Sequence, residues 1–224
     1  DGSITSSVSA NTTAGFSIVS WTGDTTSATI GHGLSQAPEL IIIKSRDGTP
    51  GSWNWPSYSK PTGTGGYINL DQSNAWTANS GFYGTAPTAS VFSPGSHSYV
   101  SGAFDFIAYC FHSVDGYSKV GSYTGNGSTD GTFIYTGFRP AFVLLKISSA
   151  SNDWILQDNK RDTYNAVGHY LRPNTNDAEL DEDSIDFLSN GFKLRTTSGA
   201  RNTSSGTYIY LAFAESPFKY SNAR

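Results

Sequence analysis

The sequence of 224 residues has few of the groups that most soluble proteins use to cover their surface or cross-link their core. It contains one cysteine, no methionine and only 14% Asp, Glu, Lys and Arg, where an ordinary soluble domain has about 25%. Because Cys110 is alone, no disulfide can form within the chain, and stability has to come from packing. Ser, Thr, Asn and Gly must cover the surface instead. This composition favours a β-rich protein that is extracellular or embedded in an assembly.

The sequence also lacks basic clusters and long apolar runs. Its 14 basic and 18 acidic residues give a formal net charge of −4, which argues against nucleic-acid binding by phosphate neutralisation. The longest apolar stretches, such as Leu40–Ile43 and Ala141–Leu145, are far shorter than the roughly 20 residues that span a bilayer, so we expect no membrane insertion. Since the chain starts at Asp1 and has no Met, we expect it to be the C-terminal part of a longer protein.

Comparing the chain with itself reveals an internal repeat at an offset of 102 residues. The repeat contains an aromatic-Thr-Gly turn, an apolar run that ends in lysine, and an apolar segment near the end of each copy. These pairs are Trp21–Gly23 with Tyr123–Gly125, Leu40–Lys44 with Phe142–Lys146, and Ile107–Phe111 with Ile209–Phe213. A register that is kept at both ends of a unit indicates a duplication.

The repeat predicts an all-β fold. We expect two tandem, duplicated, antiparallel β-sandwich-like units that pack together, with almost no helix. Within the second copy, Asn190-Gly191 predicts a tight hairpin turn. The expected segments are an N-terminal connector over residues 1–13, a first β repeat over 14–114, a second over 115–219 and a C-terminal tail over 220–224.

Aromatic residues in the loops of the first copy are the leading candidates for ligand contact. Flat rings presented among Gly, Pro, Ser and Asn can stack on the apolar faces of sugar rings, but the same rings also serve as core plugs or subunit anchors. The candidate contact residues are Trp53, Trp55, Trp76 and Tyr83.

The densest cluster of charge is the acidic stretch 177–183, from which Asp177, Asp181 and Asp183 are candidate ligands for a structural calcium ion. The spacing does not match an EF-hand loop. The alternatives are a solvated acidic loop or salt bridges between subunits to Arg161 or Arg172. The four histidines are scattered and no nucleophile motif is present, so the sequence predicts neither an enzyme nor a required cofactor.

Several phrases resemble an uncharacterised domain found in structural proteins of marine tailed bacteriophages, including cyanophages. The phrases are Gly121–Gly127, Thr136–Val143, Phe187–Lys193 and Tyr208–Glu215. The resemblance covers Gly15 to about Phe218, and the domain often lies at the C-terminal end of its protein. It implies a component of the virion surface on a tail, neck or head appendage. No catalytic residues are known for it, so none is carried over.

Together these features predict a non-enzymatic virion module that holds loops on a multimeric β scaffold and attaches to a host surface or glycan. The expected partners are copies of itself, with a trimer favoured, and other virion proteins. Low charge fits this expectation because charged residues are depleted at interface cores. The alternatives are a purely architectural capsid decoration or cement protein and a polysaccharide depolymerase of the tailspike kind.

Overall fold

The computed structural model describes residues 2–47 and 53–217, which confirm the all-β prediction. These residues form seventeen strands and a single four-residue helix, α1 (Ser98–Ser101). No helix in this part of the chain is long and apolar enough to cross a membrane. The predicted tail over residues 220–224 lies outside the described residues.

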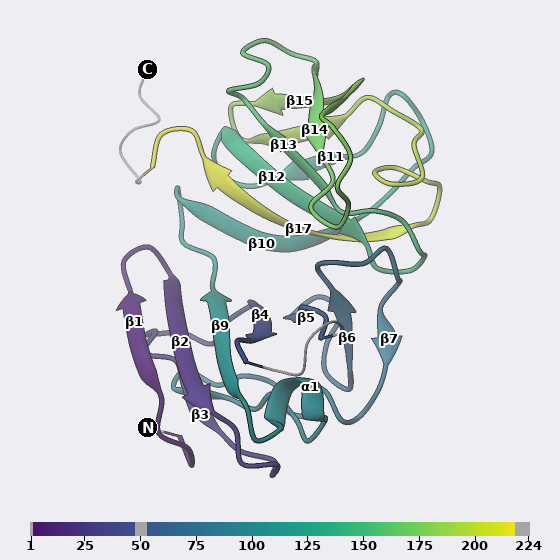
Figure 1. Cartoon of the computed structure of the whole chain (residues 1–224). Coiled ribbons are helices and arrows are strands. Elements are labelled where there is room, and N and C mark those ends of the chain that lie inside the picture. Colours follow the sequence, from purple (N-terminus) through teal and green to yellow (C-terminus); the bar gives the residue numbers. More distant parts are fainter. Residues whose placement is uncertain (1, 48–52, 218–224) are drawn as a thin grey trace. The chain divides into compact units, whose positions relative to one another are not determined.

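The chain divides into two compact units, each drawn in Figure 1. The first unit consists of the chain up to Asp71 together with Trp76–His112, and the second of Gln72–Ala75 together with the chain from Ser113 onward. The division near residue 112 lies close to the predicted one. The short segment Gln72–Ala75 joins the second unit, where the carbonyl of Ser73 accepts a hydrogen bond from the Asn152 N–H at 2.8 Å.

The first unit contains a seven-stranded antiparallel sheet in the order β1-β2-β9-β4-β5-β6-β7 and a two-stranded sheet of β3 and β8. The strands are β1 (Ser7–Asn11), β2 (Phe16–Thr22), β3 (Ile30–Gly31), β4 (Leu40–Ser45), β5 (Pro56–Ser59), β6 (Gly66–Asn69), β7 (Thr77–Ala78), β8 (Val91–Phe92) and β9 (Asp105–Phe111).

The second unit contains an eight-stranded antiparallel sheet in the order β10-β17-β12-β13-β14-β15-β16-β11. The strands are β10 (Ser118–Thr124), β11 (Phe133–Tyr135), β12 (Pro140–Ile147), β13 (Ile155–Asp158), β14 (Val167–Leu171), β15 (Leu180–Leu188), β16 (Gly191–Leu194) and β17 (Thr207–Ala214). The predicted hairpin is confirmed between β15 and β16, but Ser189 and Asn190 form its turn, since Gly191 is the first residue of β16 and pairs with Leu188. Part of the acidic stretch, predicted as a loop, belongs to β15 because Tyr170 of β14 pairs with Leu180.

Strand pairing confirms the duplication. In each unit the last strand lies between the first long strand and the apolar run: β9 between β2 and β4, and β17 between β10 and β12. The registers match as well, because Ile43 pairs with Ala108 and Leu145 pairs with Tyr210, each 102 residues further along. The sequence repeat is therefore also a structural repeat.

Each unit has its own apolar core, formed by the inward faces of these paired strands. Val19, Phe106 and Ala108 are fully buried in the first core, and Tyr208 and Ala212 in the second. The core of the first unit also contains the thiol of Cys110. Burial raises the pKa of this thiol to about 12, so it packs as an inert apolar group.

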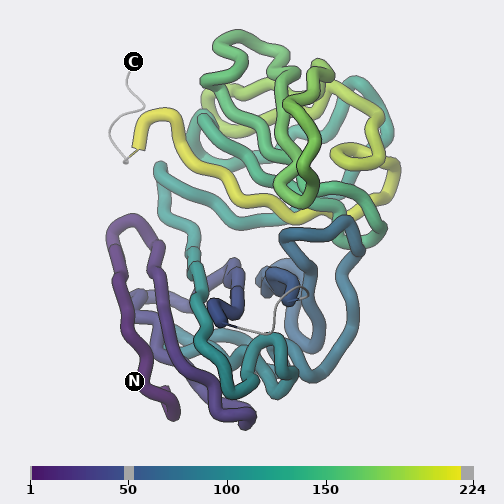
Figure 2. The backbone as a smooth tube through the Cα atoms, in the orientation of Figure 1, coloured from purple at the N-terminus to yellow at the C-terminus, as the bar shows by residue number. Residues whose placement is uncertain are grey.

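The connector predicted over residues 1–13 needs a correction, because Ser7–Asn11 form β1 and pair with β2 along their whole length. Figure 2 shows this segment as the first arm of a purple hairpin. All five side chains of β1 are exposed. The strand is therefore held by backbone pairing rather than by apolar burial. Its sequence, Ser-Val-Ser-Ala-Asn, does alternate polar and apolar residues, but the prediction of a connector rested on the Ser, Thr and Gly content of residues 1–13.

The duplication can be tested at two equivalent core positions. Ile43 and Leu145 are 0% and 1% exposed, and shortening either to Ala removes buried methyl groups and leaves a cavity. We expect Ile43→Ala and Leu145→Ala each to lower the free energy of unfolding by about 2–5 kcal/mol, measured by urea titration. The control is Tyr164→Ala at an 85% exposed side chain, which should change stability by less than about 0.5 kcal/mol. Losses equal to the control would contradict the shared core position.

Candidate functional site

Trp53 and Trp55 are half-buried, and each ring lies against another aromatic ring. The ring centres of Trp53 and Tyr99 are 5.0 Å apart, and Trp55 is parallel to Tyr109 at 6.4 Å. The Lys44 amine donates to the Trp53 carbonyl and lies 5.5 Å from the centre of the Trp55 ring. Both tryptophans therefore contribute to packing and leave only part of their surface for a ligand.

Trp76 is half-buried, whereas Tyr83 lies in the core of the first unit. The half-buried Trp76 ring lies so close to Gly66 that a Cβ there would be 2.4 Å from its Cζ2 atom. Tyr83 is 1% exposed, and its hydroxyl donates to the Pro56 carbonyl at 3.0 Å. Burial raises the Tyr83 pKa well above its ordinary value. Its candidate role as a sugar contact is therefore corrected, because a core ring presents no face to a ligand.

The three candidate calcium ligands do not converge. Asp177 bonds to Arg172, with Oδ2 at 3.3 Å from Nη1, while Asp181 lies 4.0 Å from His169 Nε2. Within residues 2–47 and 53–217 no three His, Cys, Asp or Glu side chains gather as a metal ion needs. Asp181 and Asp183 lie two residues apart on the exposed part of β15, while Asp177 lies before the strand begins. Within the chain both arginines pair with carboxylates of this stretch, Arg172 with Asp177 and Arg161 with Glu179, while the expected bridges between subunits stay a prediction.

The most exposed aromatic pair lies in the second unit, on strand β11 at the edge of its sheet. Phe133 and Tyr135 are 43% and 65% exposed, while Ile134 between them is buried. Because side chains two residues apart on a strand share a face, both rings lie on the outer face. Gly191 is opposite Tyr135 and has no side chain, which leaves room for the Phe133 ring: a Cβ at Gly191 would be 3.0 Å from its Cζ.

Charged groups flank these rings. Lys193 pairs directly across from Phe133, and its amine lies 2.5 Å from Asp130 Oδ1. Arg195 lies 3.8 Å from the same oxygen, and its Nε is 2.5 Å from Asp186 Oδ2. The hydrogen bond from Lys193 holds the pKa of the Asp130 carboxyl below its usual value. We refer to Phe133, Tyr135, Asp130, Lys193 and Arg195 as the β11 surface.

The sequence does not predict the β11 surface. Phe133-Ile134-Tyr135 is a run of strand-forming residues just before the turn at Thr136-Gly137, which favours a short strand. Because all three residues are apolar, no alternation of apolar and polar residues indicates which face is exposed. The exposure of Phe133 and Tyr135 follows from the position of β11 at the edge of its sheet.

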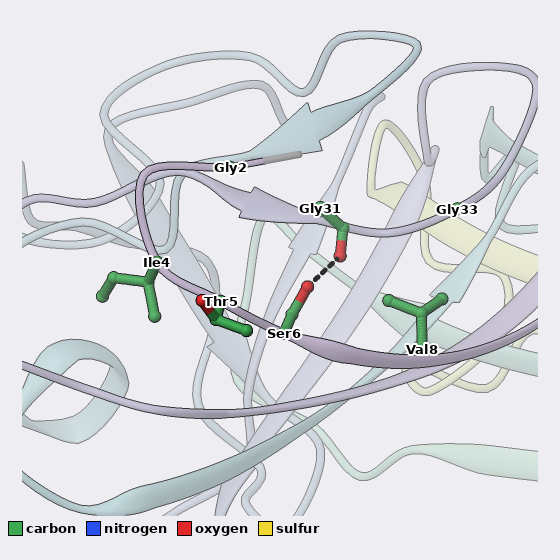
Figure 3. Close-up of a pocket in the computed structure, with 7 residues that line it drawn as sticks. All are labelled: Gly2, Ile4, Thr5, Ser6, Val8, Gly31 and Gly33. Atoms are coloured by element: carbon green, nitrogen blue, oxygen red, sulfur yellow. Dashed lines mark hydrogen bonds between the residues drawn. The ribbon is translucent and has the colours of Figure 1, made fainter.

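The first unit has two surface hollows beside its N-terminal segment. One has a volume of about 300 Å³ and is lined by the segment from Gly2 to Val8 on one side and by Gly31 and Gly33 on the other. Figure 3 shows the Ser6 hydroxyl of this hollow, which donates to the Gly31 carbonyl at 3.0 Å. None of its described lining residues is charged. The second hollow, of about 320 Å³, is lined by hydroxyl groups together with Arg46 and Asp105.

Comparison with known protein families identifies the family to which the chain belongs. Residues 1–217 match the family described as domain of unknown function (DUF7483). The chain belongs to this family. No curated protein and no solved structure matches it. What the DUF7483 chain binds has therefore to be inferred from its own residues.

This DUF7483 chain also has one histidine coupled to a carboxylate. His169 Nδ1 lies 2.8 Å from Asp162 Oδ1, and the backbone N–H groups of Gly168 and His169 donate to Asp162 Oδ2. The hydrogen bond to Asp162 raises the His169 pKa above 6.5. Burial acts to raise the pKa of Asp162, but the hydrogen bonds from His169 and Gly168 outweigh it and lower that pKa.

The hydrogen bond between His169 and Asp162 predicts that the stability of the folded protein depends on pH. A histidine whose pKa is raised on folding contributes fully below its unfolded pKa of about 6.5, and the contribution is lost as the pH rises through the folded value. The Asp162 contribution is lost at the acid end, as the pH falls through its lowered folded value. We expect His169→Asn to reduce the difference in melting temperature between about pH 5.5 and about pH 8.5. An unchanged difference, measured by circular dichroism, would refute the coupling.

Proposed function

We propose that this chain is a non-enzymatic attachment module of a tailed-phage virion and that it binds host-surface glycans through the β11 surface. The observation that carries the glycan part is the pair of exposed rings, Phe133 and Tyr135, on one face of an edge strand. Large rings are usually buried in a charge-poor protein with enough apolar residues to form two cores. Two neighbouring rings left in solvent favour a binding surface.

The chemistry of the β11 surface suits a sugar. The apolar face of a sugar ring packs on a flat aromatic ring, and the Cα atoms of these two residues are about 7 Å apart along a strand. Lys193 and Arg195 donate hydrogen bonds, and the exposed carboxylate of Asp130 accepts them from hydroxyl groups. Stacking and hydrogen bonding are thus available side by side, so one oligosaccharide could contact both rings.

The virion part of the proposal is supported by the resemblance of four sequence phrases to phage structural proteins and by the low content of charged residues. A chain with only 14% charged residues is suited to contact with neighbouring subunits, because charges are depleted in interface cores. The proposed partners are copies of the chain, with a trimer favoured, and neighbouring virion proteins.

Substitution of the two rings tests the glycan part. Phe133→Ala and Tyr135→Ala remove the stacking surface but no core contact, so folding should be retained. We expect each to weaken binding to host-cell polysaccharide by about tenfold, and the double variant to weaken it further. Binding is measured by surface plasmon resonance on immobilised polysaccharide.

The matched control is Tyr164→Ala, which removes an exposed ring elsewhere in the second unit and should leave binding unchanged. Absence of polysaccharide binding by the unaltered chain would refute the attachment proposal. If the ring variants instead lower the oligomeric state in sedimentation and leave glycan binding intact, the β11 surface is a subunit contact, as in the architectural alternative. New reducing ends after incubation would show a depolymerase.

A further inference from the structure

The second hollow of the first unit lies on the outer face of its sheet, near one end of β1, β2, β4 and β9. Ser7 pairs with Ser20, and Thr22 pairs with Asp105. Since paired residues and residues two apart share a face, these four side chains point to the same side, away from the buried Val19. Their oxygen atoms form a polar surface at the wall of a hollow of about 320 Å³.

Arg46 completes this hollow at the end of β4. Its backbone N–H donates to the Asp105 carbonyl at 2.7 Å, which extends the pairing of β4 with β9 by one residue and sets Arg46 beside Asp105. The Asp105 N–H in turn donates to the Asp47 carboxylate at 2.7 Å. The backbone of both charged residues is thus held by the sheet.

The side chains of these two charged residues keep hydrogen-bonding capacity that the other described residues do not take up. Among the described residues the Arg46 guanidinium makes no ion pair, although it lines the same hollow as the Asp105 carboxylate. Asp105 Oδ1 accepts a hydrogen bond from the Thr22 hydroxyl at 2.7 Å. Its second carboxylate oxygen has no partner in the described part of the chain. One hollow therefore presents an unpaired cation, a carboxylate acceptor and several hydroxyl groups.

We propose that this hollow binds a carboxylated sugar, such as a uronate unit of an acidic polysaccharide. The planar guanidinium of Arg46 matches a carboxylate with two parallel hydrogen bonds. Asp105 and the hydroxyls of Ser20 and Thr22 then exchange hydrogen bonds with the sugar hydroxyls. The hollow is larger than a single water site and has room for one sugar ring.

The charge pattern separates this ligand from the alternatives. A neutral sugar leaves the Arg46 charge unused. A phosphate monoester carries about −1.5 to −2 charges at pH 7 and so places more negative charge beside Asp105, where like charges repel. The neighbouring hollow in Figure 3 has no charged side chain among its described lining residues. This site is distinct from the β11 surface, and the inference does not rest on the proposed function.

Titration of the whole chain with D-glucuronate, D-glucose and acetate, followed by NMR, tests the inference. We expect glucuronate to bind more tightly than either of the other two. Arg46→Gln should weaken glucuronate binding by about tenfold or more, because it removes the charged partner. Thermal unfolding checks that this variant remains folded.

Two controls make the result specific. Lys119→Gln removes a cation from β10 of the second unit and should leave glucuronate affinity unchanged. The Phe133→Ala, Tyr135→Ala double variant should also retain it, which separates this site from the β11 surface. Equal binding of acetate and glucuronate, or an unchanged affinity in Arg46→Gln, would overturn the inference. Loss of glucuronate binding in the double variant would likewise overturn it, by assigning the sugar to β11.

Discussion

The pairing of the last strand of each unit between two earlier strands is the constraint on which the rest of the fold depends. β9 and β17 each bond to neighbours along both edges, so their backbone groups are satisfied while their inward side chains are buried. This arrangement brings together segments about ninety residues apart in sequence, such as Trp21 with Phe106 and Tyr123 with Tyr208. Each core can form only after these distant strands meet.

The two copies share this central pairing and differ around it. In the first unit β1 pairs with the outer edge of β2. In the second unit β10, which is equivalent to β2, is itself the edge strand of its sheet. The second unit in turn places β11 and its exposed rings at the other edge. Both candidate binding surfaces therefore lie where the copies diverge. A conserved scaffold can carry different surfaces because the loops and edges contribute little to the core.

The chain has few charged residues, and some of their side chains are buried and form bonds within the fold. Lys146 is fully buried and donates to the Ile147 carbonyl at 2.8 Å, and burial lowers its pKa to about 8. Arg201 is 1% exposed, pairs with Glu182 at 2.8 Å and lies 4.1 Å from the centre of the Tyr170 ring. Arg46 differs from these two buried groups because its side chain is exposed and makes no ion pair with another described residue.

The sequence by itself determined the all-β class, the duplication and the hairpin between β15 and β16, because each depends on local turn chemistry or on a repeat that survives in the residues. It did not determine which rings are exposed. Tyr83 lies in a loop-like stretch yet is a core residue, while Phe133 and Tyr135 lie in a short strand yet face solvent. Lys44 and Lys146 occupy equivalent positions but differ in burial. Only the tertiary structure decides these cases, because exposure depends on which distant segments cover a side chain.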